Sequence, residues 1–126
     1  MEPAGAAAAS FLGAGAGAAA GAAAGAGIAY LCGGGYGEVI HTVVNALAIV
    51  SGMVCDGAKA SCAAKIASSV DAGILGYNMY LNGQQFYAGD GIVTKGVEAT
   101  IGNIGRLGKD GMRETNEEII KMMIEE

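Results

Sequence analysis

The chain has 126 residues, a formal net charge of −5 and only 15% charged residues. This length suffices for one domain with one core, and the scattered lysines and arginines form no basic stripe, which argues against a nucleic-acid partner. Hydrophobic residues make up 52% of the sequence, but alanine is the commonest of them and 23 residues are glycine, so a core must depend on close approach between backbones.

The first segment, residues 4–29, consists almost entirely of alanine and glycine. Gly13, Gly17, Gly21 and Gly25 recur every four residues, which on a helix aligns them in a ridge that a second helix can approach closely. Because an interior glycine costs roughly 1 kcal/mol relative to alanine, we expect this helix to form only when packed. The segment is long enough to span a membrane, but alanine and glycine contribute little transfer energy, which argues against a small membrane protein.

Two helices are predicted in the middle of the chain from the spacing of apolar residues. The run Tyr36–Met53 is expected to form a buried helix that ends near Ser51-Gly52, and Cys55-Asp56-Gly57 is expected to form a turn. A second helix is predicted over Ala60–Leu81, closed by Asn82-Gly83. The residues of its apolar face are Ala63, Ile66, Ala67, Val70, Ile74 and Tyr77.

Two further helices are predicted after a loop through Gly89-Asp90-Gly91. The first is marked by Val93, Val97, Ile101, Ile104 and Leu107, and is expected to end at Gly108. Thr115 and Glu118 have the spacing of a capping box, so the last helix is expected to begin near Thr115. No segment alternates as a half-buried strand requires. The sequence therefore predicts an all-α fold of about five helices in a single domain, residues 1–126.

The chain has three cysteines: Cys32, Cys55 and Cys62. Because the number is odd and the N-terminus does not have the pattern of a secretory signal, we expect a cytoplasmic protein with reduced thiols. Cys55 in a turn and Cys62 near a helix start could face one point, where the helix dipole favours a metal-binding thiolate. Their spacing matches no common zinc motif, and buried, inert thiols are the alternative.

Several motifs resemble one family. They are the run from Gly52 to Lys59 (GMVCDGAK), Cys62-Ala63-Ala64-Lys65, the run from Asp90 to Val93 (DGIV) and the run from Gly105 to Met112 (GRLGKDGM). Together they resemble the C-terminal region of the iron-sulfur-dependent L-serine dehydratase alpha domain, on the branch that contains L-cysteine desulfidases. Members of that family are several times longer. The resemblance therefore implies a C-terminal part of a larger helical catalytic domain, completed by an N-terminal portion, a companion chain or a homo-oligomer.

The resemblance also implies a [4Fe-4S] cluster held by three cysteines, with one iron left to act as a Lewis acid on a small amino-acid substrate. The implied reaction is a β-elimination from L-cysteine or L-serine that yields pyruvate and ammonia, and also sulfide from cysteine. Cys55 is the implied first ligand and Cys62 the second. The third is open, because the upstream cysteine of relatives is missing here: Cys32 and a partner's ligand are the alternatives.

Asp56, Lys59 and Lys65 lie next to the implied ligands and are candidates for orienting the substrate carboxylate or moving protons. A solvated turn with an ion pair explains them equally well. His41 is interpreted as a hydrogen-bonded structural residue rather than a proton carrier. The competing hypothesis for the whole chain is a helical structural or assembly subunit without catalysis.

Overall fold

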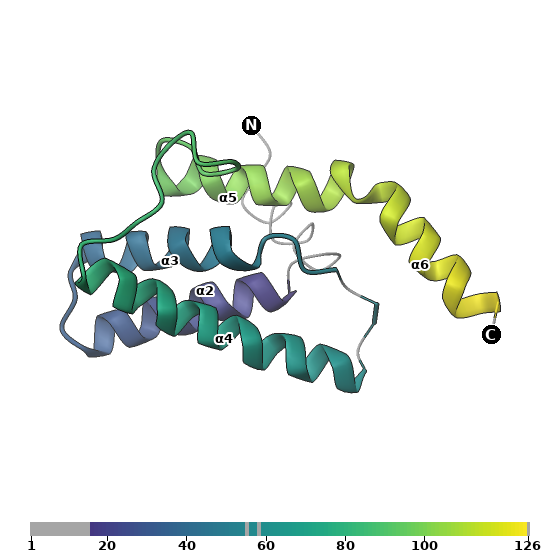
Figure 1. The fold of residues 1–126 in the computed structure, drawn as a ribbon, viewed down its shortest axis with the longest axis horizontal. Coiled ribbons are helices and arrows are strands. Elements are labelled where there is room, and N and C mark those ends of the chain that lie inside the picture. Colours follow the sequence, from purple (N-terminus) through teal and green to yellow (C-terminus); the bar gives the residue numbers. More distant parts are fainter. Residues whose placement is uncertain (1–15, 55, 58, 126) are drawn as a thin grey trace.

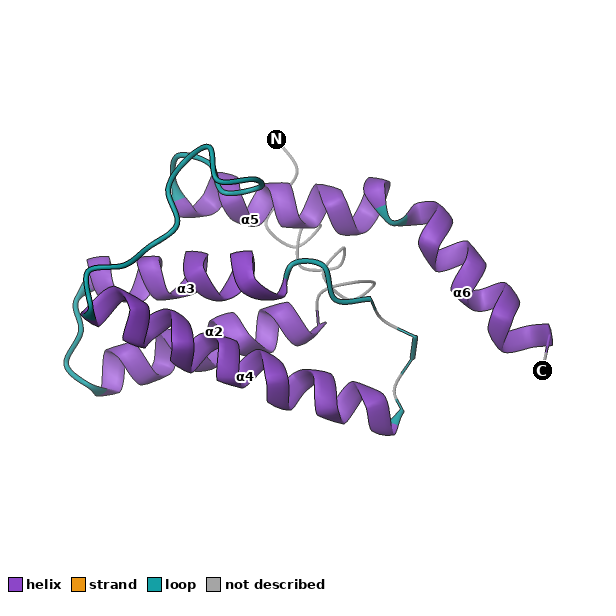
Figure 2. Cartoon of the chain, in the orientation of Figure 1, coloured by secondary structure: helices purple, strands orange, loops and turns teal. Residues whose placement is uncertain are grey.

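The computed structural model describes residues 16–54, 56–57 and 59–125, and this part of the chain is helical without any strand. The elements are α2 (Ala16–Leu31), α3 (Tyr36–Val50), α4 (Ala60–Leu81), α5 (Val97–Arg106), the short π-helical segment η1 (Leu107–Gly111) and α6 (Arg113–Glu125). Helices α2, α3 and α4 pack together, α5 lies along α3, and α6 extends away from the body (Figures 1 and 2). The predicted all-α fold is confirmed. None of the described helices has both the length and the apolarity needed to cross a membrane.

Glycines bring α2 and α4 into direct backbone contact. A methyl group built on Gly25 would lie 2.9 Å from the Cα atom of Gly73, and one built on Gly21 would overlap the carbonyl oxygen of Ser69. The predicted glycine ridge is therefore confirmed for Gly21 and Gly25. Gly13 lies outside the described residues, as do the surroundings of Gly17.

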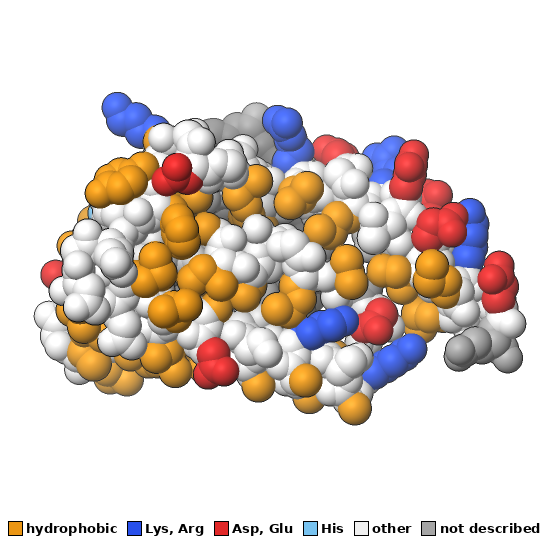
Figure 3. Space-filling view, viewed as in Figure 1, with side chains coloured by type: hydrophobic (Ala, Val, Ile, Leu, Met, Phe, Trp, Pro, Cys, Tyr) orange, Lys and Arg blue, Asp and Glu red, His pale blue; other side chains and the backbone are white. Residues whose placement is uncertain are grey.

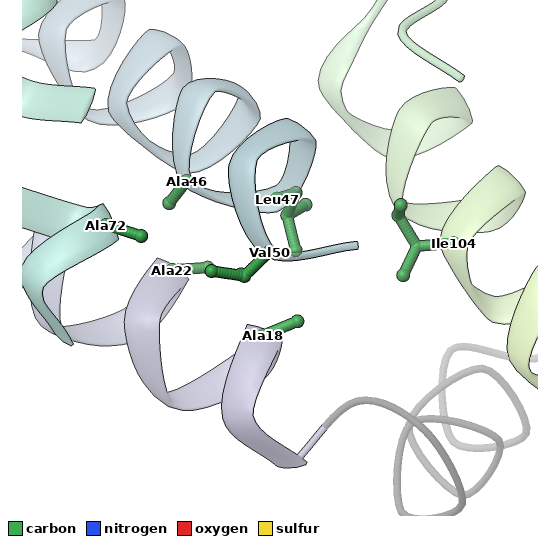
Figure 4. Close-up of a cluster of buried hydrophobic side chains, with 7 residues drawn as sticks. All are labelled: Ala18, Ala22, Ala46, Leu47, Val50, Ala72 and Ile104. Carbon is green, nitrogen blue, oxygen red and sulfur yellow. The ribbon is translucent and has the colours of Figure 1, made fainter. Parts of the chain in front are cut away.

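The hydrophobic core is small and rich in alanine (Figure 4). Its buried members are Ala18, Ala22, Ala46, Leu47, Val50, Ala72 and Ile104. Beside it, the buried Asn45 side chain donates a hydrogen bond from Nδ2 to the carbonyl oxygen of Gly76 (3.0 Å) and accepts one at Oδ1 from the amide of Phe86 (3.2 Å). Asn45 thus ties α3 both to α4 and to the loop that follows α4.

Two helices end in the same glycine-dependent motif. After α2, Gly33 has φ +86° and the Gly34 amide donates to the carbonyl of Ala29 (2.9 Å). After α4, Gly83 has φ +72° and the Gln84 amide donates to the carbonyl of Met79 (2.8 Å). Both have the hydrogen-bond pattern of the Schellman motif, which needs a left-handed residue just after the helix. The predicted helix end at Asn82-Gly83 is confirmed.

The bounds of α4 match the prediction, but the face that it buries does not. The buried residues are Ser69, Ala72, Gly73 and Gly76, whereas Ile66 and Ile74 of the predicted apolar face are each 39% exposed. The reason is the close crossing with α2, which only small side chains permit. The larger apolar residues of α4 are therefore not part of the buried core of this chain.

The C-terminal helices differ from the prediction at their boundaries. Helix α5 begins at Val97 rather than Val93, because Gly96 has φ +96° and breaks the helix; Val93 is buried in the preceding loop. Gly108 does not end it either, since the chain continues through η1, where the Met112 amide donates to the carbonyl of Leu107 (2.9 Å). By contrast, α3 ends at Val50 with Ser51 as its C-cap, as predicted, and α6 begins two residues before Thr115.

Candidate functional site

The candidate site is the loop that leads into α4, together with the first turns of that helix. Gly57 has φ +106°, a conformation that favours glycine. The Lys59 amide then donates to the carbonyl of Gly57 (3.0 Å), and Lys59 in an extended conformation precedes the helix. Gly57 thus has the left-handed conformation that Asp-Gly favours, whereas Cys55, the first residue of the predicted turn and the first implied cluster ligand, lies outside the described residues.

An ion pair fixes this loop to α4. The Lys65 Nζ atom lies 2.9 Å from Asp56 Oδ1, and the two side chains are 27% and 39% exposed. The hydrogen bond from Lys65 and its positive charge lower the pKa of Asp56, and the charge of Lys59 acts in the same direction. Asp56 is therefore an ionised carboxylate at neutral pH.

Cys62 lies in the first turn of α4, half-buried, and its amide donates to the carbonyl of Lys59 (3.0 Å). Lys65 follows three residues later and Ser69 four residues after that, a spacing that places the three side chains along one side of the helix. The Ser69 hydroxyl donates to the carbonyl of Lys65 (2.8 Å) and contacts the sulfur of Met53 (3.9 Å). The thiol and the ion pair therefore occupy the same end of α4.

Helix α6 contributes one side chain to this loop. A methyl group built on Gly57 would lie 3.9 Å from the Cε atom of Met123. No pattern in the sequence indicates a site residue in α6, because methionine at helical spacing is a common packing residue. A residue more than sixty positions away in sequence thus lies beside this loop.

Cys32 lies elsewhere. It is an exposed residue at the end of α2, immediately before the left-handed Gly33. It lies near Tyr77, whose pKa is raised by partial burial and, in addition, by Cys32 and Glu38. Tyr77 is fifteen residues beyond Cys62 on α4, which corresponds to about 22 Å along the helix axis. The structure therefore does not bring Cys32 and Cys62 together.

His41 also belongs to the end of the molecule that contains Cys32. Its ring stacks on that of Tyr80, with centroids 5.2 Å apart and an interplanar angle of 13°. This contact agrees with the interpretation of His41 as a structural residue rather than a proton carrier. Among the residues that the structure describes, no three His, Cys, Asp or Glu side chains are grouped so that they could hold a metal ion. Any ligand set that includes Cys62 must therefore draw on Cys55 or on residues outside the described part.

The glycine run at positions 33–35 has a structural explanation. Gly33 closes α2, and a methyl group on Gly34 would lie 2.7 Å from the carbonyl oxygen of Ala29. The Gly35 amide donates to the carboxylate of Glu38 at the start of α3. These glycines connect two helices over a very short distance.

Comparison with known proteins identifies the family. Residues 4–121 match the family described as "Serine dehydratase alpha chain". Over 98 residues the chain is 71% identical to a UPF0597 protein of Desulfitobacterium hafniense and 53% identical to one of Lachnoclostridium phytofermentans; over 99 residues it is 51% identical to one of Finegoldia magna. These matches cover 78–79% of this chain but only 23–24% of the relatives.

No solved structure matches the chain significantly. The family match nevertheless extends over nearly the whole sequence, including the loop with Asp56, the first turns of α4, and α5 with η1. The chain therefore belongs to the serine dehydratase alpha chain family.

Proposed function

We propose that this chain is part of an iron-sulfur-dependent amino-acid β-lyase of the L-serine ammonia-lyase or L-cysteine desulfidase type. The observation that carries the proposal is the family match over residues 4–121. The chain spans about a quarter of the length of its relatives, so the activity would belong to a larger polypeptide or assembly. L-Serine and L-cysteine differ only in the β-substituent that leaves, and both reactions release pyruvate and ammonia.

The donor chemistry at the start of α4 suits such a cluster. Thiolates are the usual ligands of iron-sulfur clusters, and Cys62 is a half-buried thiol in the first turn of a helix, where the dipole favours negative charge. Cys55 would be the second ligand, as the family motif implies. The distance of Cys32 from Cys62 favours a third donor from the remaining polypeptide or a partner chain.

When bound, the cluster would supply a Lewis acid that polarises the substrate during elimination. The neighbouring charges suggest how this chain would assist. Lys59 is exposed at the entrance to α4, where its ammonium group would attract the substrate carboxylate. Lys65 would add a second positive charge, held in position by Asp56 at 2.9 Å.

Asp56 is better suited to positioning than to proton transfer. A general base works best when its pKa lies near the operating pH, whereas Lys65 and Lys59 lower the pKa of Asp56 below its ordinary value. We therefore assign to Asp56 the role of holding Lys65 Nζ, and thereby the loop that carries Cys55. Asp56→Asn should then raise the KM for the amino acid more than it lowers kcat.

Anaerobic reconstitution with iron and sulfide tests the proposal. The chain would be combined with the part of the Desulfitobacterium hafniense relative that lies outside the 98 matched residues. The complex should bind iron, and Cys55→Ala or Cys62→Ala should abolish binding, while Cys32→Ala should leave it largely intact. If the wild-type complex binds no iron, the cluster assignment fails and a structural subunit becomes the better description.

A further inference from the structure

An apolar stripe of exposed and half-buried side chains follows one side of α4. Its residues recur every three or four positions: Ile66, Val70, Ile74, Tyr77 and Leu81. Ile66 and Ile74 are each 39% exposed, and Leu81 is 58% exposed. Because successive members occupy one side of the helix, they form a surface about 22 Å long between the first and the last residue. We call this surface the α4 stripe.

The stripe contrasts with the buried core of the same chain. The side of α4 that contacts α2 and α3 consists of Ser69, Ala72, Gly73 and Gly76, so the larger apolar residues of this helix contribute little to the described core. Figure 3 shows apolar side chains spread over the visible face across the bundle, with charged ones concentrated toward the end that carries α6. Apolar surface of this extent and continuity usually marks an interface.

We propose that the α4 stripe packs against a helix from the remaining three quarters of the family polypeptide. Three observations support this occupant. The chain spans only 23–24% of its relatives, so most of the polypeptide that would share its core is outside this sequence. The stripe contains no charged residue, which favours an apolar protein surface. Its spacing of three and four residues is that of a helix that packs lengthwise against another helix.

The proposal also explains the composition of α4. One side of α4 carries small residues, which permit its close contact with α2. The α4 stripe carries larger residues, which can pack against a helix that lies farther from the α4 axis. A helix with two such sides is typical of the interior of a larger bundle. The inference depends on the family membership of the chain and is independent of the cluster and the lyase chemistry.

Co-purification tests this docking surface without iron. The tagged chain would be co-expressed with the part of the Desulfitobacterium hafniense relative outside the 98 matched residues. We expect the wild-type chain to retain that part, and Ile66→Glu/Ile74→Glu to retain at least tenfold less, because the new carboxylates would be buried without partners. Ala64→Glu/Ser68→Glu adds the same charge at exposed positions on another side of α4 and should bind like the wild type.

Circular dichroism of each tagged chain checks that its helix content is unchanged. Leu81→Glu provides a second variant at a more exposed position, where the folding of the chain is little affected; it too should weaken retention. The proposal is overturned if the wild-type chain fails to retain the remaining polypeptide, or if Ile66→Glu/Ile74→Glu retains it equally. It is also overturned if the stripe instead holds two copies of this chain together, as sedimentation of the chain alone would show.

Discussion

Gly21 of α2 lies directly against the backbone of Ser69 in α4, so that a methyl group at Gly21 would overlap the Ser69 carbonyl oxygen. The contact explains why α2 consists almost only of alanine and glycine: larger side chains would separate the two helices. On the α4 side, Ser69 is small enough to allow the same close approach. Its hydroxyl donates to the Lys65 carbonyl four residues earlier, so it needs no partner on α2.

Substitution of alanine for glycine should therefore have opposite effects at two positions of α2. Gly21→Ala should lower the free energy of unfolding by about 1–3 kcal/mol, because the added methyl group forces α2 and α4 apart. Gly27→Ala should raise it by roughly 0.5–1 kcal/mol, since nothing lies within 4 Å of that position and alanine favours the helix. Urea denaturation of the two variants measures both effects.

The two substitutions are chemically identical and lie in the same helix, so intrinsic helix propensity cancels between them. If Gly21→Ala is as stable as Gly27→Ala, then α2 and α4 do not cross as closely as the structure shows.

Asn45 provides a second prediction. Asn45→Ala would leave the carbonyl of Gly76 and the amide of Phe86 without their side-chain partner. The Phe86 amide would then lack a partner, and such a loss typically costs about 1–3 kcal/mol, so the variant should be clearly destabilised in thermal or urea unfolding. Asn78→Ala is the matched control: its side chain bonds only to the Ile74 carbonyl at an exposed position, and its effect should stay within about 0.5 kcal/mol.

The sequence predicted those features of the fold that depend on local pattern. The bounds of α4, the glycine contacts of Gly21 and Gly25 and the helix end at Gly83 all follow from residue spacing or from a required left-handed conformation. The start of α5 was missed because the apolar spacing continues through Val93 into a loop, and only the conformation of Gly96 shows where the helix begins.

The orientation of α4 could not be predicted by hydrophobic periodicity. That method assigns the largest apolar side chains to the core of the chain, whereas Ile66 and Ile74 face outward here. The candidate site was also only partly predictable from the sequence. The motif indicated Asp56 and Lys65, and their ion pair was one of two interpretations. The contact of Met123 with this loop was not predictable, because it depends on the path of the chain through η1.

The Asp56–Lys65 pair predicts a dependence of stability on pH. Because the pKa of Asp56 is lowered in the folded chain from its ordinary value of 3.8, the pair stabilises the fold fully above that value. The contribution is lost as the pH falls through the lower, folded pKa. Asp56→Asn should thus be less stable than the wild type at pH 7, and this difference should disappear toward pH 2.

Lys65→Met supplies the control for this measurement. In that background Asp56→Asn should have little effect at any pH, because the partner that lowers the Asp56 pKa is gone. A difference that persists unchanged in the Lys65→Met background would mean that another group, not Lys65, stabilises the carboxylate.

The separation of Cys32 from Cys62 leads to the last prediction. Cys32 lies near Tyr77 toward one end of α4, and Cys62 lies in the first turn at the other end, about 22 Å away along the axis. In a Cys55→Ser variant, which leaves these two thiols, oxidation should form no disulfide within one chain, because a disulfide requires Cα atoms within about 7 Å.

A short bifunctional maleimide should likewise label Cys32 and Cys62 separately. Cys32 should react faster, because it is exposed and Cys62 is half-buried. Mass spectrometry of the digested monomer distinguishes the products. A peptide pair linked through Cys32 and Cys62 would show that the two ends of α4 come within reach of one another, and Cys32 would then return as a candidate third ligand.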